Sequence, residues 1–521
     1  MLFKYSIIVL YQKHLRVISC ILGLFINAYY KTYLLQNIVM LYYCRVSSTV
    51  KDGVARLMNT LCSAGLLAIP YIYRPFGLVT GICMTFFVSL LALIGLLVQA
   101  QVIRYVSLRY ASFFSLAQIT SPKLGIIFDF AIASRCFCSC VIHLLVIRDL
   151  LPVPFTSNSE SMTEFLLSPR IQLTFITVIV IIPFCFSRNV CVTKHLMRLS
   201  IMVLVYFGCV ITILFWMKPG DLKDYRGKIS IGIPHNINDD DNDDDDDSNM
   251  LKSMALLIFV FNSHHHMFAM INEQEEIRFC EVKKIAMIVS SIQFFIALFI
   301  GVVGYLTFGN NVSENILCLY PALWSVSILK FFYIILMISC FLFQCYPLRA
   351  SLNRIINWIQ NRFYNKAVGD TFNDQSRNSD ASAITMVYDQ TTPLLTCEGH
   401  TIPIEELVEE GSNKQLVIMP MTERNFKIYS SAILICAYLI AMTKITMISV
   451  LVFVGSTSSA VISYILPGIF AYQLIGIEYE SFCTKRPFIT SFFKYAGLCL
   501  AIFGIFVLML YTIFILPHEI F

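Results

Sequence analysis

The chain contains many apolar windows that are long enough to cross a lipid bilayer as helices. A spanning helix needs roughly 20 mostly apolar residues, because every backbone hydrogen bond must be made inside the segment. The expected spans cover residues 54–72, 78–101, 124–147, 171–187, 198–217, 251–272, 285–307, 326–348, 427–447, 449–475 and 491–516. The sequence therefore predicts an all-α multi-pass membrane protein with about eleven transmembrane helices.

Composition agrees with a membrane protein and excludes several other classes. Of the 521 residues, 57% are hydrophobic and 14% are charged, too few charges to cover the surface of a soluble protein of this length. No basic patch with interleaved aromatics lies outside the apolar windows, so we expect no nucleic acid partner. The 18 cysteines fall mostly in apolar runs such as Arg135–Cys140, without metal-ligand or disulfide spacing, which favours packing.

Lys and Arg residues near the ends of the expected spans predict the orientation of the chain. Their excess on one set of loops favours a cytoplasmic N-terminus and, with an odd number of spans, an extracytoplasmic C-terminus. The expected regions are an N-terminal segment (1–50), spans 1 to 5 (51–217), an acidic extracytoplasmic loop (218–250), spans 6 to 8 (251–349), a disordered cytoplasmic loop (350–426), spans 9 and 10 (427–475), and span 11 with the C-terminus (476–521).

Two of the apolar windows, the first and the sixth, are interrupted by polar or small residues. Residues 59–70 begin with Asn59 and contain the run Ser63, Ala64 and Gly65, whereas residues 261–273 contain Asn262, Ser263 and three histidines. A broken helix persists in hydrocarbon only where protein or a polar ligand satisfies the freed backbone groups. Paired breaks in the two halves of a chain indicate the binding site of a transporter.

Each break has a functional and a simpler interpretation. In the first, free amides at the start of the second half-helix would suit a carboxylate, but Ala64 and Gly65 could also serve a close helix contact. In the second, polar groups at membrane depth indicate function, and the cluster His264, His265 and His266 suggests a metal path. Consecutive helical residues point about 100° apart, so the three histidines cannot share a site unless the helix unwinds.

Together these segments resemble the amino acid/auxin permease family, which includes sodium-coupled neutral and vacuolar amino acid transporters. The resemblance rests on five segments in order: Asn59–Tyr71, Ser263–Glu273, Gly304–Leu317, Tyr346–Arg349 and Val454–Pro467. It implies the amino acid-polyamine-organocation superfamily fold, a five-plus-five inverted repeat with broken helices 1 and 6. The site would lie between spans 1, 3, 6 and 8.

The chain departs from the family pattern at positions that face this site. Ser63 replaces the first glycine of span 1, and Ser263 and Ala269 replace a cysteine and a proline in span 6. In span 3, Cys138 and His143 replace a glycine and a tyrosine. These departures affect the residues that would determine which substrate is accepted.

The resemblance implies a secondary active transporter of amino acids, and we favour a neutral substrate. Its carboxylate would bind at Ser63, Ala64 and Gly65, its ammonium at Asn262 and Ser263, and its side chain near His143, with Asn59 and His264 also in the site. Sodium coupling would use Asn59 with Ser339 or Cys340, although a thiol is a poor ligand for a hard cation. Proton coupling would use His264 or His143. No other cofactor and no enzymatic activity are expected.

Three other functions compete with amino acid transport. A divalent-metal transporter would use His264–His266, and an amino acid sensor with little flux would bind protein partners on residues 350–426. The aspartate run Asp239–Asp247 suggests a prenyltransferase, but such enzymes need a second aspartate-rich site, which the sequence lacks. The expected location is the plasma membrane or a lysosomal or vacuolar membrane. The segment Asp389–Leu395 resembles an acidic dileucine sorting signal, but its spacing is one residue too long.

Overall fold

The computed structural model describes the apolar part of the chain almost completely. Described residues are 48–61, 64–106, 111–121, 124–151, 168–186, 191–217, 226–233, 243–272, 278–321, 323–369, 421–475 and 487–515. The chain divides into two units, residues 1–52 and 53–521. The first unit is described only at residues 48–52. Most of the N-terminal segment, the dileucine-like sequence and much of both long loops therefore lie outside the described residues.

The first half of the chain is helical wherever the structure describes it, apart from short connections. Its elements are α2 (Ser48–Leu61), α3 (Gly65–Phe76), α4 (Leu78–Val102), η1 (Ile103–Tyr105), α5 (Phe113–Thr120), α6 (Gly125–Leu150), α8 (Pro169–Ile176), η4 (Thr177–Ile181), α9 (Ile182–Phe186) and α10 (Cys191–Met217). The π-helical turn η4 joins α8 and α9 into one continuous span.

The second half of the chain is also helical apart from short connections. Its elements are α11 (Asp243–Val260), α12 (His264–Asn272), α13 (Phe279–Phe308), η6 (Gly309–Asn311), α14 (Ile316–Leu319), α15 (Trp324–Gly369), α16 (Glu423–Met442), α17 (Met447–Val454), η8 (Gly455–Ser459), η9 (Val461–Ile465), α18 (Leu466–Leu474), α19 (Pro487–Leu510) and η11 (Tyr511–Ile515). Two π-helical turns, η8 and η9, join α17 to α18. No strand occurs among the described residues.

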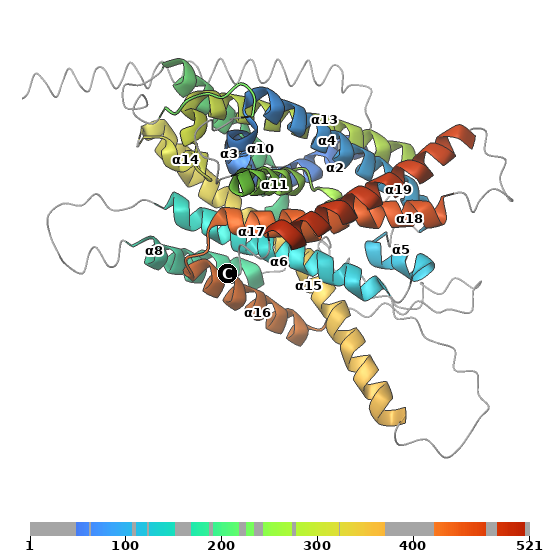
Figure 1. The fold of residues 1–521 in the computed structure, drawn as a ribbon. Helices are drawn as coiled ribbons and strands as arrows, with labels where there is room; N and C mark the ends of the chain where they lie inside the picture. Colours follow the sequence, from blue (N-terminus) through green and yellow to red (C-terminus); the bar gives the residue numbers. More distant parts are fainter. Residues whose placement is uncertain are drawn as a thin grey trace, which may run out of the picture. The chain divides into compact units, whose positions relative to one another are not determined.

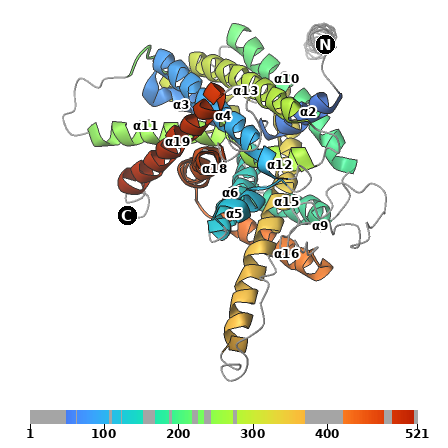
Figure 2. The same ribbon diagram turned by 90° about the vertical axis from the view of Figure 1, so that its right-hand side faces the viewer.

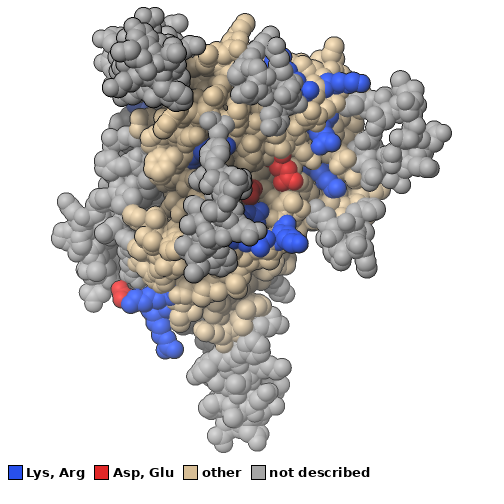
Figure 3. All heavy atoms as spheres, turned by 90° about the vertical axis from the view of Figure 1, so that its left-hand side faces the viewer, with Lys and Arg blue, Asp and Glu red and all other residues tan. Residues whose placement is uncertain are grey.

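The helices have the length and the surface of membrane spans. Among the described residues, 10 helical segments are long and apolar enough to cross a bilayer. The first expected span is the broken pair α2 and α3, each half of which is too short to cross alone. Large apolar side chains face outward, including Phe130 (67% exposed) and Trp324 (82%). Figure 3 shows that most of the described surface on one face bears no charge, while acidic side chains lie with Lys and Arg near its centre. The predicted all-α multi-pass fold is confirmed.

Within residues 53–521, two groups of helices can be distinguished by their extensive contacts, and α10 and α17 contact both groups. In one, α15 lies along α6 over a long contact, and α16 packs on α6 as well (Figures 1 and 2). In the other, α13 packs against α3 and α4, and α11 packs against α3. Close approach of α13 to α3 depends on glycine, because a Cβ added at Gly304 would lie 2.5 Å from Cγ of Pro70. The inverted relation between the two halves stays a prediction.

Three boundaries differ from the sequence prediction. Helix α15 continues to Gly369, so the loop expected from residue 350 begins later; the first residues beyond 349 pack inside the protein, with Arg354 2% exposed. Helix α11 begins at Asp243, inside the aspartate run, because acidic residues in a first helical turn complement the helix dipole. Spans 9 and 10 are separated by residues 443–446, where the Thr446 hydroxyl accepts a hydrogen bond from the Ser449 amide and caps α17.

Candidate functional site

The first span breaks where the sequence predicts. Helix α2 ends at Leu61 and α3 begins at Gly65, with the buried Ala64 between them; the carbonyl of Ala64 accepts a hydrogen bond from the amide of Leu67 at 3.1 Å. Ser63 lies outside the described residues. Asn59 lies in the last turn of α2, and its side chain is likewise not described.

Gly65 brings the two breaks together. A Cβ added there would lie 3.0 Å from Cγ2 of Val260 and 3.2 Å from the ring of Phe259, both in the last turn of α11. That distance is tighter than ordinary van der Waals contact, so the missing side chain lets the start of α3 approach the end of α11. The small-residue contact weighed at this position is therefore present, and it places the free end of α3 beside the second break.

The second break covers residues 261–263, between α11 and α12. Two glutamines from neighbouring helices bind backbone carbonyls on either side of the break. Gln293 of α13 donates to the carbonyl of Val260 at 2.6 Å, and Gln99 of α4 donates to the carbonyl of His264 at 3.0 Å. Buried backbone groups without partners are costly in hydrocarbon, so these amides stabilise the broken conformation.

Asn262 and Ser263 line the break with polar atoms that have no protein partner. Both side chains are buried, at 5% and 0% exposure, and neither the Asn262 amide nor the Ser263 hydroxyl makes a hydrogen bond. Buried polar groups normally find a partner. These atoms are therefore available to a polar ligand, at the position where the sequence places the substrate ammonium.

The three histidines of α12 do not all face the same neighbouring helix. His264 lies against α4, where a Cβ added at Gly95 would come within 2.7 Å of its Nε2. His266 faces α15: its Nε2 lies 3.2 Å from Nε2 of Gln344, and its ring stacks on Phe343. The ring centroids of His265 and His266 lie 3.9 Å apart. Nowhere in the described part of the chain do three His, Cys, Asp or Glu side chains gather as metal ligands.

The middle of α6 adds two buried polar side chains on the other side of the break. His143 is 2% exposed, and its Nδ1 has no hydrogen-bond partner. Arg135 is 4% exposed, donates to the Ser139 hydroxyl, and lies with its guanidinium carbon 4.1 Å from the centre of the Phe259 ring. Arg135 of α6 thus lies against the last turn of α11, next to the second break.

Comparison with known proteins identifies the family of this arrangement. A sequence profile described as "transmembrane amino acid transporter protein" matches residues 46–510. The chain belongs to this amino acid transporter family. It is 33% identical over 463 residues to vacuolar amino acid transporter 6 of Saccharomyces cerevisiae, covering 89% of this chain and 97% of that protein. It is 31% identical over 473 residues to vacuolar amino acid transporter 5 of the same yeast, covering 89% and 96%.

Membership of this family confirms the resemblance read from the five sequence segments. The relatives are transporters, so the expectation that the chain is not an enzyme is also confirmed, and the prenyltransferase interpretation is removed. Amino acid transport, with the bilayer as surroundings, is the function of the family. The substrate-binding residues, the coupling ion and any protein partners of residues 350–426 stay predictions.

The sodium-site candidates of this transporter are only partly described. The Ser339 hydroxyl donates to the carbonyl of Ile335, one turn earlier in α15, at 2.9 Å. Cys340, the next residue, offers a buried thiol. The Asn59 side chain lies outside the described atoms, so a sodium site formed by these three groups stays a prediction.

Sequence reasoning missed three residues of the transporter's centre, namely Arg135, Gln99 and Gln293. Each carried a usable signal, because a charged or amide side chain in the middle of an apolar window is rare and usually functional. Arg135 begins the run Arg135–Cys140, in which the three cysteines are the more visible feature. The two glutamines bind backbone carbonyls across helices, a pairing that requires knowledge of which helices are neighbours.

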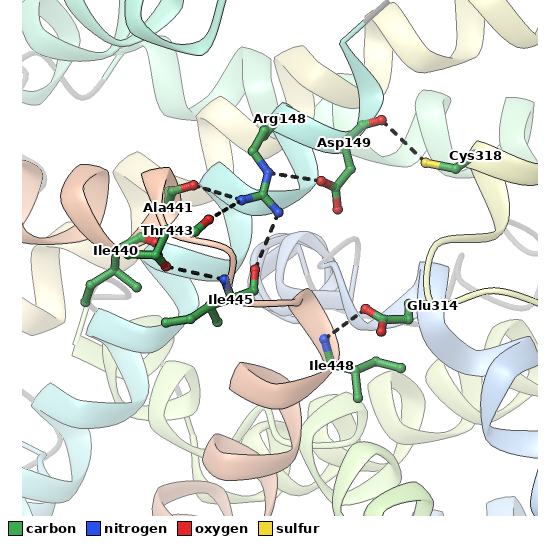
Figure 4. A network of polar contacts seen from close by, with 9 residues as sticks. All are labelled: Arg148, Asp149, Glu314, Cys318, Ile440, Ala441, Thr443, Ile445 and Ile448. Carbon is green, nitrogen blue, oxygen red and sulfur yellow. Dashed lines mark hydrogen bonds and ion pairs between the residues drawn. The ribbon is translucent and has the colours of Figure 1, made fainter. Parts of the chain in front are cut away.

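A second polar cluster lies at the end of α6 that the sequence predicts to be extracytoplasmic (Figure 4). The Arg148 guanidinium donates to the carbonyls of Ala441 and Thr443 at 2.9 and 3.1 Å and forms an ion pair with Asp149 at 3.2 Å. The Glu314 carboxylate accepts from the amide of Ile448, near the start of α17, at 3.3 Å. The cluster therefore joins α6, the segment between α13 and α15, and the connection between α16 and α17.

Proposed function

We propose that the chain carries an α-amino acid across the membrane by alternating access between the two groups of helices. The amides at the start of α3, at Ala64 and Gly65 and at the preceding Ser63, bind the substrate carboxylate. The polar atoms of Asn262 and Ser263 bind the ammonium, and His143 lines the space for the side chain. The observation that supports this assignment is the close approach of Gly65 to the end of α11, which brings both polar ends within reach of one small zwitterion.

The test is amino acid uptake by the purified protein in proteoliposomes. Gly65→Val places a branched side chain where a single Cβ already lies 3.0 Å from Val260, so we expect uptake to fall to background. Gly208→Ala is the control for substitution of a helix glycine, and Gly65→Ala is compared with it directly: the Cβ at Gly208 would meet only the Phe299 ring at 3.5 Å, an ordinary contact. Unchanged uptake by Gly65→Val would refute the site, and failure of the unaltered protein to carry any amino acid would refute the function.

We propose that protons, rather than sodium ions, drive this transport. The two candidates in α15 are the Ser339 hydroxyl and the Cys340 thiol, and a thiol is a poor ligand for sodium because hard cations prefer oxygen. His143 or His264 would then carry the proton. Uptake driven by a pH gradient in choline buffer supports this proposal, and uptake that requires a sodium gradient at constant pH contradicts it.

We propose a vacuolar or lysosomal membrane as the location, since the relatives are named as vacuolar transporters. Imaging of the full chain with a fluorescent tag, against markers of both compartments, tests this assignment. Signal confined to the plasma membrane would contradict it. The neutral substrate that we favour from the sequence stays a prediction.

A further inference from the structure

His264 begins α12 at a place where three elements of the chain meet. Helix α12 contacts both α4 and the π-helical turn η9 of span 10, and η9 contacts α4. The His264 side chain is 0% exposed, and neither of its buried ring nitrogens makes a hydrogen bond of normal length. Buried polar groups normally have a partner, so this imidazole is available to a species that the protein itself does not supply.

Gly95 of α4 leaves a small space beside the imidazole. A Cβ added at Gly95 would lie 2.7 Å from Nε2 of His264 and 2.6 Å from the carbonyl oxygen of Ser463 in η9. Real Cβ atoms essentially never come that close to another heavy atom. The ring nitrogen and the carbonyl oxygen therefore border the same space, which stays open because residue 95 is glycine.

The carbonyl of Ser463 lacks the donor that an ordinary α-helix would give it. In an α-helix this carbonyl would accept from the N–H four residues later, but that residue is Pro467, which has none. Ser463 also lies inside η9, and π-helical turns occur mostly at functional sites. An acceptor is thus held beside the ring of His264 at membrane depth.

The groups around His264 suit a protonated ring better than a neutral one. A neutral imidazole has one donor and one acceptor, whereas an imidazolium has two donors. Besides the Ser463 carbonyl, the junction contains Oε1 of Gln99, which is buried and has no hydrogen-bond partner. The Gln99 amide nitrogen is already used, because it donates to the backbone carbonyl of His264 at 3.0 Å. Open acceptors therefore outnumber open donors beside the ring.

His264 is the titratable group that faces this space. None of α4, α12 and η9 carries a carboxylate, a lysine or an arginine. Of the other titratable side chains near the junction, His265 packs on His266, and Tyr464 of η9 packs on Phe503 of α19. The sequence of α4 from residue 84 to its end has no titratable side chain.

We propose that the coupling proton binds to the ring of His264, which then donates a hydrogen bond from Nε2 to the carbonyl of Ser463, directly or through one water molecule. Gly95 and Pro467 are positioning residues, because one keeps the space open and the other keeps the carbonyl without its helical donor. The inference rests on the proposed function and names the group in it that carries the proton.

The proton would make a link between the second break and span 10. Helix α12 continues the chain from the break, whereas η9 belongs to the span Met447–Leu474. A proton from water on the more acidic side adds to the free ring nitrogen, and the link forms. Its release to water on the other side removes the second donor, and the link is lost. The junction thereby has two states that differ by one proton, as alternating access requires.

The deciding experiment separates accumulation driven by a pH gradient from exchange. Proteoliposomes with the purified full chain receive a labelled mixture of the common amino acids in sodium-free choline buffer. Exchange against the unlabelled mixture is measured at equal pH on both sides, and accumulation is measured with one pH unit imposed in either direction. One proton moved with each amino acid drives about tenfold accumulation at this gradient.

We expect His264→Gln to abolish this accumulation, whatever rate of exchange remains. Accumulation by His264→Gln equal to that of the unaltered protein would overturn the inference, as would its loss in His143→Gln alone. If the unaltered protein exchanges amino acids but does not accumulate them in a pH gradient, the inference fails together with proton coupling, while amino acid transport stands. If the unaltered protein exchanges none, the proposed function fails and the inference with it.

Pro467→Ala tests the carbonyl partner, with the midpoint of the pH dependence of exchange as the readout. It restores an N–H four residues after Ser463, which competes for the carbonyl. We expect proton binding to weaken about tenfold, as for the loss of one hydrogen bond to a charged group, so the midpoint moves about one pH unit toward acid. A purely structural role would change the rate and leave the midpoint in place, and that result would contradict the assignment.

Gly95→Ala tests the space itself. Its Cβ would separate the ring from the carbonyl, so we expect the midpoint to move toward acid at least as far as in Pro467→Ala. Gly208→Ala is the control, because its Cβ would meet only the Phe299 ring at 3.5 Å, and it should leave the midpoint unchanged. An unchanged midpoint in a folded Gly95→Ala protein would contradict the inference. If Gly95→Ala does not fold, Pro467→Ala and His264→Gln decide.

Discussion

Nε of Arg354 lies 2.9 Å from both carboxylate oxygens of Asp129, and neither side chain reaches the surface. This ion pair connects α15 to the beginning of α6, where the two helices run side by side. Arg349, just over one turn earlier in α15, connects the same helix to α9 and α16. Four helices are therefore joined at the end that the sequence predicts to be cytoplasmic, and they are expected to move as one body.

Breaking the ion pair should destabilise the protein strongly. Asp129→Asn removes the negative charge and leaves a buried guanidinium unpaired, which typically costs about 3–5 kcal/mol. Thermal unfolding of the purified protein in detergent should show a clearly lower midpoint. The double variant Asp129→Leu with Arg354→Met removes both charges and should recover most of the loss. Equal destabilisation of the single and double variants would argue against the pairing.

The amide of Gln293 should be needed to keep the sixth span broken. Gln293→Leu leaves the buried carbonyl of Val260 without its partner, a cost of about 1–3 kcal/mol in stability, and it should lower amino acid uptake because the break borders the site. Ser291→Ala is the control, since that hydroxyl is exposed and bonds only within its own helix. Normal stability and uptake of Gln293→Leu would show that the carbonyl finds another partner.

The thiol of Cys318 should react slowly with maleimides near neutral pH. Partial desolvation by the surrounding protein and the carboxylate of Asp149 raise the pKa of Cys318 to about 11, while Lys330 acts in the opposite direction. The reactive thiolate should therefore increase about tenfold for each pH unit from 7 to 10. Asp149→Asn should lower this pKa and speed labelling, while Cys318→Ser gives the background. Labelling by an impermeant reagent from outside tests the orientation, and rapid labelling independent of pH would contradict the predicted pKa.

Glu314 should make the protein more stable in mild acid than at neutral pH. Desolvation and the nearby Asp149 raise the pKa of Glu314 above 4.5, and the hydrogen bond from the Ile448 amide offsets this only in part. Glu314 has a higher pKa in the folded protein than in the unfolded chain, where it is near 4.5. Between these two pKa values the folded protein binds the proton more tightly, so stability rises as the pH falls through this interval. Glu314→Gln keeps an acceptor for Ile448 and should weaken this pH dependence. An identical stability profile for the variant and the unaltered protein would exclude Glu314 as the cause.

The positions of the spans and of both breaks follow from the sequence because they are local properties. A run of about twenty apolar residues cannot be stable in hydrocarbon except as a helix, and the polar residues at Asn262 and Ser263 interrupt such a run visibly. The extension of α15 to Gly369 could not be predicted in the same way. Its polar residues beyond 349 resemble a loop until the partner of Arg354 on α6 is known.

The residues around the breaks were harder to predict because their roles depend on neighbouring helices. Three consecutive histidines indicate function in general, but only the packing separates His264, which faces Gly95 of α4, from His266, which faces Gln344 of α15. For the same reason Arg135 reads as one polar residue in an apolar run. Its contact with the Phe259 ring of α11 becomes visible only in three dimensions.

The length of α15 has a mechanical consequence. Its 46 residues extend about 69 Å, more than twice the roughly 30 Å hydrocarbon core. Figure 2 shows α15 running alongside α6 and continuing past it. A small tilt of α15 within the bilayer therefore becomes a larger displacement at Gly369, as at the end of a lever. Each transport cycle would then move this end of α15 on the side of the membrane that the sequence predicts to be cytoplasmic.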